Sequence, residues 1–394
     1  MDPAQALSSD RLSALPDDLL RRIMSFLNAR HTVQMCLLSR RWCYLWRSLP
    51  RINAEFTEFY YEDAARFKKF INTLLLRRDP VPLDMFWLRY EQSNGNDLQE
   101  GSEEAGLWIS HALQLQASVV EVVTLEAPLV LDHSVFTSRS LRRLRLSTAN
   151  IPEGFFEQLK TGCPNLEDLL LYDCLILDDE ISSNSLKILN INDSRFCEDY
   201  DASISIPSLT SLTLYRPGAR VPLLSTKIPS LVSASVILAG SDGAMKFDHF
   251  CQLLMNLSDV RNLDLDYDPE KIEIKDNMQW CPEFKKLVNL TLGPWCLDSN
   301  FYALTGFLQN SPNLEKLTLE PEGIIDELEE RSFKCEHLKI VEVICSKRSP
   351  LLKRVNDFFV NSGMSSLQIN RKGSNEIEYC PDYFRFEYRA HMWK

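Results

Sequence analysis

The chain has no apolar run near the roughly 20 residues that a membrane-spanning helix needs, so we expect no bilayer passage. It also lacks the short motifs of common enzyme sites: no G-x-S-x-G turn, no phosphate-binding P-loop and no H-E-x-x-H zinc motif occurs. Its six histidines are scattered, and none stands beside a cysteine in a recognised nucleophile setting. We therefore expect a non-enzymatic protein with no catalytic residue and no cofactor.

Basic residues are in short supply, with 43 Lys and Arg against 55 Asp and Glu and a formal net charge of −12. This excess of acid argues against a general nucleic-acid binder, which normally shows a basic patch. The charge is uneven, because residues 1–50 hold seven Arg and four Asp, a balance of +3, which leaves −15 for the remainder. A basic N-terminal module suits an acidic partner and would speed the encounter with it more than it would raise affinity.

The eleven cysteines include no C-x-x-C pair. Cys335 and His337 are close in sequence, but no second pair of ligands accompanies them, so we expect no metal site. No secretory signal peptide is evident at the N-terminus, which favours a reducing compartment and hence the cytoplasm or the nucleus. Most of the thiols are then expected to be small buried hydrophobic groups.

Residues 10–50 are predicted to form three short helices. Pro16 suits a first helical position, where its missing N–H costs nothing, and Asp17 follows in the positive first turn. Thr32 and Ser39 are the expected caps of the second and third helices. A unit of about 40 residues is near the lower limit for independent folding.

This N-terminal unit carries more large apolar side chains than its own small core could cover, and the apolar residues between Leu19 and Leu27 are too many for a one-sided amphipathic helix. Some of that surface must be covered by something else. Packing on the following domain and docking of another protein are both compatible with these residues.

The order Leu15-Pro16, Leu19-Leu20, Ile23 and Ser39-Arg-Arg-Trp42 resembles the F-box, with the spacing that motif requires. The resemblance implies that residues 10–50 bind the Skp adaptor of a cullin-type ubiquitin ligase. The residues that the resemblance assigns to the adaptor contact are Leu12, Leu15, Pro16, Leu19, Leu20, Ile23, Leu27, Leu37, Leu38, Arg41, Trp42 and Trp46.

A second pattern, apolar-x-x-apolar-x-apolar, recurs through the rest of the chain. From Val120 its starts are 21, 25, 20, 23, 22, 29, 27, 27, 24 and 26 residues apart, within the 20–29 residues of a leucine-rich repeat. Leu83/Phe86/Leu88 is a candidate opening unit and Met364/Leu367/Ile369 a candidate closing one. The predicted fold is α/β: a three-helix F-box, then an irregular leucine-rich-repeat solenoid with a curved parallel sheet and helices on its convex side. The ten units from Val120 are Val120/Val123/Leu125, Leu141/Leu144/Leu146, Leu166/Leu169/Leu171, Leu186/Leu189/Ile191, Leu209/Leu212/Leu214, Leu231/Ala234/Val236, Val260/Leu263/Leu265, Leu287/Leu290/Leu292, Leu314/Leu317/Leu319 and Leu338/Val341/Val343.

The solenoid is expected to be irregular, because only Cys174 occupies the Asn/Cys position that normally bonds the turn. The segment from Phe333 to Val360 resembles the FBD segment that follows the repeats in many plant F-box proteins. Within the second expected division below, residues 93–106 read as a solvated loop and 107–115 as a short helix. The expected divisions are a disordered tail over 1–9, the F-box over 10–50, a linker and N-terminal cap over 51–115, repeats over 116–345, and an FBD-like last repeat with a C-terminal cap over 346–394.

Side chains alternate along a strand, so the residues that flank the central apolar position of each unit point away from the core. They are short polar groups with a few Arg, Tyr and Asp, which can bond a partner without burying unsatisfied charge. These positions are also explained by solvent exposure alone. The candidate substrate-binding residues are Arg143, Arg145, Asp168, Tyr172, Asn190, Tyr215, Asn262, Asp264 and Lys316.

The resemblance as a whole implies a substrate-recognition subunit of a Skp–cullin–F-box ubiquitin ligase, which holds a protein substrate and performs no covalent step. The implied partners are a Skp-type adaptor, through it a cullin, and a protein substrate, with no nucleic acid and no membrane. Two alternatives stay open: an interaction scaffold that is not coupled to a cullin, and a hormone or small-molecule receptor. The second would need long loops over the concave face, and intervals of at most 29 residues leave little room for them.

Overall fold

A computed structural model gives the fold in two compact units, Met1–Leu231 with Ser241–Met245 and Val232–Gly240 with Lys246–Lys394. The expected tail over 1–9, Cys335 and residues 373–394 of the expected C-terminal cap lie outside the residues it describes. The described residues are 12, 14–59, 64–91, 98–125, 127–197, 201–218, 220–238, 246–267, 280–297, 302–320, 337–344, 351–361 and 368–372.

The N-terminal helices are shorter than expected. α1 spans Asp17–Met24 and α2 spans Ala29–Gln34, followed by two 3₁₀ turns, η1 at Met35–Leu37 and η2 at Leu45–Ser48. The prediction of Thr32 as a cap was wrong: Asn28 caps α2 by accepting the backbone N–H of His31 (3.2 Å), and Thr32 is buried inside the helix.

The third predicted α-helix does not form. The backbone N–H of Trp42 donates to Ser39 O (3.0 Å) and that of Leu45 donates to Trp42 O (3.2 Å). These bonds span three residues rather than four, so the chain winds into turns and 3₁₀ structure here. Trp42 and Leu45 reach the core through these turns.

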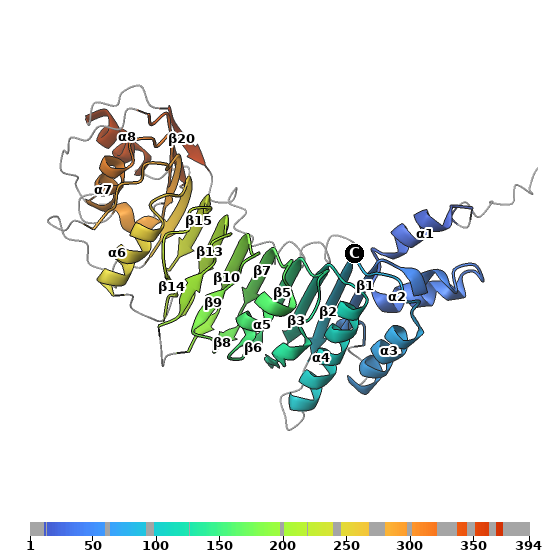
Figure 1. Cartoon of the computed structure of the whole chain (residues 1–394). Helices are drawn as coiled ribbons and strands as arrows, with labels where there is room; N and C mark the ends of the chain where they lie inside the picture. The colour runs from blue at the N-terminus through green and yellow to red at the C-terminus, as the bar shows by residue number, and fades with distance from the viewer. Residues whose placement is uncertain are drawn as a thin grey trace, which may run out of the picture. The chain divides into compact units, whose positions relative to one another are not determined.

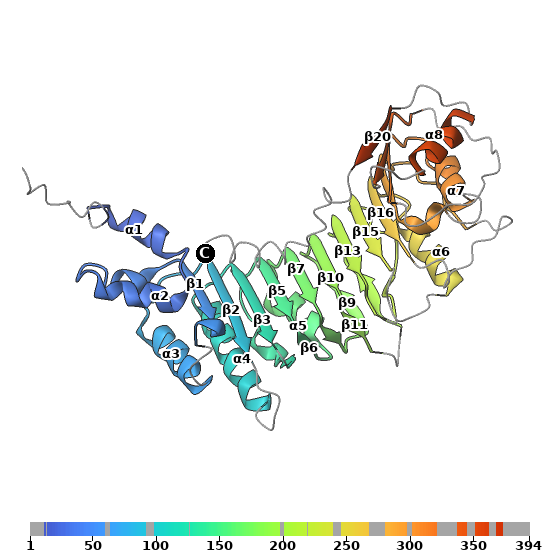
Figure 2. The ribbon, with the colours of Figure 1, turned by 180° about the vertical axis from the view of Figure 1, so that it is seen from behind.

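The first unit is built on a parallel sheet in the order β1-β2-β3-β5-β7-β10-β13 (Figures 1 and 2). One row of residues in register, Ile52, Phe86, Val120, Leu144, Leu169, Leu189 and Leu212, is buried along its whole length. The strands are β1 Arg51–Glu55, β2 Met85–Glu91, β3 Val119–Leu125, β5 Arg143–Ser147, β7 Asp168–Tyr172, β10 Ile188–Asn192 and β13 Ser211–Tyr215.

The second unit continues the same repeat with six parallel strands among the described residues. Their buried central positions, Ala234, Leu263, Leu290, Leu317 and Val341, pair in register, and α6 (Phe247–Asn256), α7 (Tyr302–Asn310), α8 (Leu351–Asn361) and η5 (Pro294–Leu297) connect the strands. The strands are β15 Ser233–Ile237, β16 Asn262–Asp266, β17 Asn289–Leu292, β18 Lys316–Leu319, β19 Ile340–Ile344 and β20 Gln368–Lys372. The predicted leucine-rich-repeat fold is confirmed.

The predicted linker after residue 50 is in fact the first strand of the sheet. β1 pairs in parallel with β2, and Leu49, Ile52 and Ala54 supply a complete, buried apolar-x-x-apolar-x-apolar unit. The starts Leu49, Leu83 and Ala117 are 34 residues apart, beyond the usual repeat length, because a full helix lies in each interval. These helices are α3, Ala64–Arg77, and α4, Leu98–Gln114, with η3 at Phe56–Phe59.

The glycine-rich segment over 93–106 was predicted to be a loop, but its described part, from residue 98, belongs to α4. Ser102 and Ala105 are buried, as are Ile109 and Ala112 further along the helix. A stripe of small residues lets this helix lie close to its neighbours, and that stripe does not stand out as an apolar run in the sequence.

Two repeat registers also differ from the prediction. Val120 pairs with Leu144, so the unit at β3 is Ala117/Val120/Val122 rather than Val120/Val123/Leu125. Ile369 pairs with Val341 and therefore takes the central position of its unit, not the last.

Helices cover only some of the repeats. α5, Phe155–Gly162, follows β5, but the shorter units after it are connected by two small parallel sheets, β11-β8-β6-β4 and β14-β12-β9. Intervals of 20–23 residues are too short for a helix between strands. These strands are β4 Leu129–Val130, β6 Ala149–Ile151, β8 Leu175–Ile176, β9 Glu180–Ser182, β11 Arg195–Phe196, β12 Ser203–Ser205 and β14 Leu223–Leu224, with η4 at His133–Val135.

The turn after several strands is bonded by three different residue types at one repeat position. The side chain of Cys174 donates to Leu146 O (3.7 Å), that of Ser194 to Leu171 O (3.5 Å) and the indole of Trp295 to Leu265 O (3.2 Å). Each acceptor is the last apolar position of the preceding repeat. The prediction that Cys174 alone serves this position was therefore incomplete.

Candidate adaptor-docking surface and sheet face

The F-box segment has a small core of its own. Leu20, Met24, Trp42 and Leu45 are buried together with Leu49, and Leu15, Met35 and Trp46 pack against them. Leu49 is also the first position of the β1 repeat, so the F-box core and the repeat core share a side chain. Leu20 and Trp42, at 1% and 2% exposure, hold this core together and do not lie on the outer surface.

The opposite side of the F-box is apolar and exposed. Seven of the fifteen exposed large hydrophobic side chains of the described residues lie between 12 and 44: Leu12, Leu19, Ile23, Phe26, Leu37, Leu38 and Tyr44. Leu19, Ile23 and Phe26 follow helical i, i+4, i+7 spacing, so they share one face of α1 and its C-terminal turn. α1 is therefore apolar on two sides, and only one of them is covered within the chain.

The structure divides the predicted adaptor residues into three groups. Leu15, Leu27 and Trp46 are half-buried beside the F-box core, and Leu20 and Trp42 are inside it. We therefore correct the assignment of Leu20 and Trp42 to the contact surface, because neither presents its side chain outward. The exposed residues are Leu12, Pro16, Leu19, Ile23, Leu37, Leu38 and Arg41.

Arg41 is exposed but it already has partners within the chain. Its Nε donates to Asp17 Oδ1 (2.8 Å) and its Nη2 to Leu15 O (2.8 Å). The Ser-Arg-Arg-Trp turn is in this way tied to the start of α1. This bonding indicates that Arg41 orients the apolar surface, whatever contact it makes with a partner.

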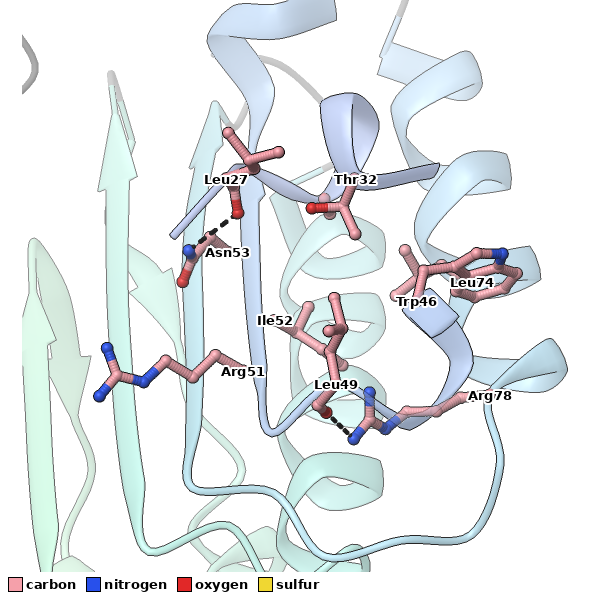
Figure 3. A pocket seen from close by; sticks show the side chains of 10 residues that line it. Leu27, Thr32, Trp46, Leu49, Arg51, Ile52, Asn53, Leu74 and Arg78 are labelled. Atoms are coloured by element: carbon pink, nitrogen blue, oxygen red, sulfur yellow. Dashed lines mark hydrogen bonds between the residues drawn. The ribbon is translucent and has the colours of Figure 1, made fainter. Parts of the chain in front are cut away.

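The F-box joins the first repeat through polar contacts to backbone carbonyls. Asn53 of β1 donates to Leu27 O (3.1 Å), and the buried guanidinium of Arg78 donates to Leu49 O (Figure 3). Between them lies a cavity of about 20 Å³, lined in part by Thr32 and Trp46. This volume holds about one water molecule, so the cavity is too small for a hormone-sized ligand.

Glu58 lies at the same junction and is nearly buried. Its Oε1 lies 3.0 Å from Nδ1 of His31, and its backbone carbonyl accepts from Arg30, whose guanidinium lies over the Phe59 ring at 4.5 Å. Burial, and next the Glu55 carboxylate, raise the pKa of Glu58 to about 7, against a lowering effect of Arg30.

We expect Glu58→Gln to stabilise the protein at pH 8 and to lose this advantage by pH 5. The folded-state pKa of Glu58 is above the unfolded value, so wild-type stability falls as pH rises from about 4.5 to about 7. Thermal melting at both pH values checks this, with Glu153→Gln at an exposed position as the control. A Glu58→Gln variant that is less stable than wild type at pH 8 would contradict it.

The candidate substrate residues of the first unit all lie on the sheet face away from the buried row. Register places Arg143 beside Asp168, aligns Arg145 with Asn190, and aligns Tyr172 with Tyr215. Arg143 is exposed, Asp168 is buried, and the other four are half-buried. The sequence therefore placed these side chains on one face, but it did not reveal how they pair.

The charges on this face pair with one another across neighbouring strands. Arg143 Nε lies 2.7 Å from Asp168 Oδ2, and Arg145 lies 3.6 Å from Glu121 Oε1. Arg89 lies 3.8 Å from Glu55. Burial raises the pKa of Glu121, while Arg145 and Arg143 lower it. The face consequently presents little net charge.

Apolar and aromatic side chains fill the space between these ion pairs. Met85, Trp87 and Val123 of β2 and β3 are half-buried on this face, and Leu170 of β7 is buried in the same register row as Trp87. Prediction missed Met85, Trp87 and Glu121. Residues that flank the central Phe86 of the candidate opening unit would have indicated the first two.

The sheet face of the second unit is bonded differently. Asn289 donates to Asn262 Oδ1 (2.7 Å), Asn262 donates to Ser233 Oγ (2.9 Å), and Ser235 donates to Asp264 Oδ2 (2.9 Å). Lys316 lies 3.0 Å from Glu342. The predicted Asn262, Asp264 and Lys316 thus lie on one face, each already paired with a neighbouring strand.

Within the described part of the chain, no group of three or more His, Cys, Asp or Glu side chains could hold a metal ion. None of the helices described there is long and apolar enough to cross a bilayer.

Comparison with known proteins finds a match between residues 12–53 and the F-box domain family. The chain is 30% identical over 351 residues to an F-box/FBD/LRR-repeat protein of Arabidopsis thaliana, covering 79% of this chain and 77% of that protein. It is 29% identical over 351 residues to the meiotic F-box protein MOF of rice, covering 79% and 71%. An F-box/LRR-repeat protein of Arabidopsis is 27% identical over 302 residues, covering 69% of this chain and 94% of that protein. With a matching F-box, a confirmed repeat fold and these relatives, the chain belongs to the F-box/FBD/LRR-repeat proteins of plants.

Proposed function

We propose that this protein is the substrate-recognition subunit of a Skp–cullin–F-box ubiquitin ligase. F-box domains generally bind a Skp-type adaptor, and F-box/LRR proteins are typically non-catalytic adaptors. The proposal goes further: the F-box recruits a cullin through that adaptor, the sheet face holds a protein substrate, and the complex acts in the cytoplasm or nucleus.

The observation that carries the proposal is the exposed apolar side of the F-box. Leu19, Ile23, Leu37 and Leu38 lie outside the F-box core, although residues of the same segment pack tightly inside it. An exposed apolar patch of this kind marks a protein-interaction site. The chain therefore already uses one side of the F-box for its own fold and leaves the other for a partner.

The role of this chain in ubiquitin transfer is positional. The contacts of Asn53 and Arg78 with F-box carbonyls, and the shared Leu49, fix the F-box to the first repeat. A substrate held by the following strands would then keep a defined distance from the adaptor. Such positioning raises the effective concentration of reacting groups with no chemical step by this chain.

Co-expression with a Skp-type adaptor and a cullin, followed by gel filtration, tests the proposal. We expect one complex that contains all three proteins, and this chain alone to be poorly soluble. A complex with the adaptor that excludes the cullin would favour the scaffold alternative. A monomer that ignores the adaptor would refute docking, and a fluorescent fusion seen only outside the cytoplasm and nucleus would refute the proposed location.

For the substrate, the first-unit face favours an uncharged segment with apolar and aromatic side chains. Its Arg and Asp/Glu groups are compensated within the face, and Trp87, Met85 and Tyr172 supply contact area. We expect a random peptide display library, selected on the adaptor complex, to yield peptides of low net charge that lose binding to Trp87→Ala. Selection of strongly acidic or basic peptides would contradict this assignment.

A further inference from the structure

Two thiols face each other across the turn that carries Leu37 and Leu38. Cys43 Sγ donates to the backbone carbonyl of Cys36 (3.2 Å), and Cys36 Sγ donates to the carbonyl of Cys43 (3.6 Å). Each sulfur therefore contacts the backbone of the other cysteine. Both cysteines are free and only half-buried.

A second observation confirms that the sulfur atoms themselves are neighbours. Burial raises the pKa of the Cys36 thiol, and the Cys43 thiol raises it further, both by its charge and by a side-chain hydrogen bond. Cys163, Cys174 and Cys296 are by contrast buried. Half-buried, adjacent thiols are the arrangement in which an oxidant has access and an intramolecular partner waits.

We propose that Cys36 and Cys43 form a redox-active dithiol site that closes to a disulfide with oxidised glutathione, and that closure weakens adaptor docking. The second half of this statement rests on the proposed function; the first half does not. The site is distinct from a structural disulfide framework, because the reduced pair already packs without a bond between the sulfur atoms.

The reaction is a two-step thiol–disulfide exchange. The Cys43 thiolate attacks one sulfur of oxidised glutathione, which forms a mixed disulfide and releases one glutathione thiolate. The Cys36 thiolate then attacks the Cys43 sulfur, the second glutathione leaves, and the released thiolates take up the two protons. Two protein thiols are oxidised to one disulfide, and one oxidised glutathione is reduced to two glutathione molecules.

Closure would change the turn, because a disulfide has no S–H donor. The carbonyls of Cys36 and Cys43 would lose the thiols that now bond them, and the two sulfur atoms would approach to about 2.05 Å. Leu37 and Leu38 lie inside the eight-residue ring that forms. We expect their exposed side chains to leave the geometry that suits the adaptor, with affinity reduced about tenfold.

The site can be tested on the full chain in glutathione buffers of rising oxidised fraction, quenched with iodoacetamide and digested with trypsin. Cleavage after Arg30, Arg40, Arg41 and Arg47 places Cys36 in peptide 31–40 and Cys43 in peptide 42–47. We expect a linked pair of these peptides to appear before any glutathione adduct on the half-buried Cys197. Separate adducts on Cys36 and Cys43, or alkylation of both throughout, would overturn the site.

Adaptor affinity is measured on the same samples, with Cys43→Ser as the matched variant, since its hydroxyl keeps a donor for the Cys36 carbonyl. Wild-type affinity should fall on oxidation and recover with reductant, while the variant should show no change. A linked peptide with unchanged affinity would overturn the control of docking. Failure of the reduced chain to bind adaptor would refute the proposed function and leave the peptide result to decide the dithiol site.

Discussion

Replacing Leu37 and Leu38 together by aspartate is expected to lower affinity for a Skp-type adaptor by at least about 100-fold and to leave the fold intact. The two leucines are 88% and 68% exposed, so the free chain loses little packing when they change. Burial of a leucine in an interface contributes about 1.5–3 kcal/mol. Losing two of them exceeds the roughly 2.8 kcal/mol that a 100-fold change represents, and a buried carboxylate adds a further penalty.

The chain offers a closely matched control for this pair. Leu76 of α3 and Leu107 of α4 are 83% and 68% exposed and lie outside the F-box. Calorimetric titration with the adaptor should give wild-type affinity for Leu76→Asp with Leu107→Asp. Equal loss in both double variants would show that added negative charge, and not the F-box surface, is responsible; no loss in either would remove Leu37 and Leu38 from the interface.

The second large effect concerns Trp42, which the sequence pattern assigned to the adaptor contact and the structure places in the core. Trp42→Ala should cost about 3–5 kcal/mol of F-box stability, the usual cost of removing a buried large aromatic side chain. The loss would appear as faster hydrogen exchange over residues 14–49, because Leu20, Met24 and Leu45 pack in the same cluster. Adaptor binding would then fall as a consequence of unfolding.

Trp42→Phe separates the two roles. The indole Nε1 is buried with no hydrogen-bond partner among the described residues, so its removal leaves no bond broken. We expect Trp42→Phe to keep most of the stability and most of the adaptor affinity. If Trp42→Ala abolished binding with unchanged hydrogen exchange, Trp42 would be an interface anchor and its place in the core would have to be revised.

The sequence predicts the repeats well where each strand has one unambiguous apolar spacing, as in Leu166/Leu169/Leu171. It fails at β3, because four valines between Val119 and Val123 allow more than one register. It fails at β1 because Ala54 is a weak apolar signal and a 34-residue interval follows Leu49. Only pairing with β2 reveals that strand.

The docking surface was predictable as a segment but not as a face. Leu19 and Leu20 are adjacent, as are Ile23 and Met24, and the sequence does not say which of each pair turns inward. The structure buries Leu20 and Met24 and exposes the other two. The pairing of Arg143 with Asp168, 25 residues away, likewise depends on strand register, which propensity alone does not contain.

The shared Leu49 has a practical meaning for modularity. A fragment that ends at residue 50 would keep Leu49 but lose Ile52, Asn53 and Arg78, which complete the junction around it. The F-box of this protein is therefore not an exchangeable cassette. A chimera between family members should place its boundary after α3, at residue 79 or later, so that the grafted piece carries its own first strand.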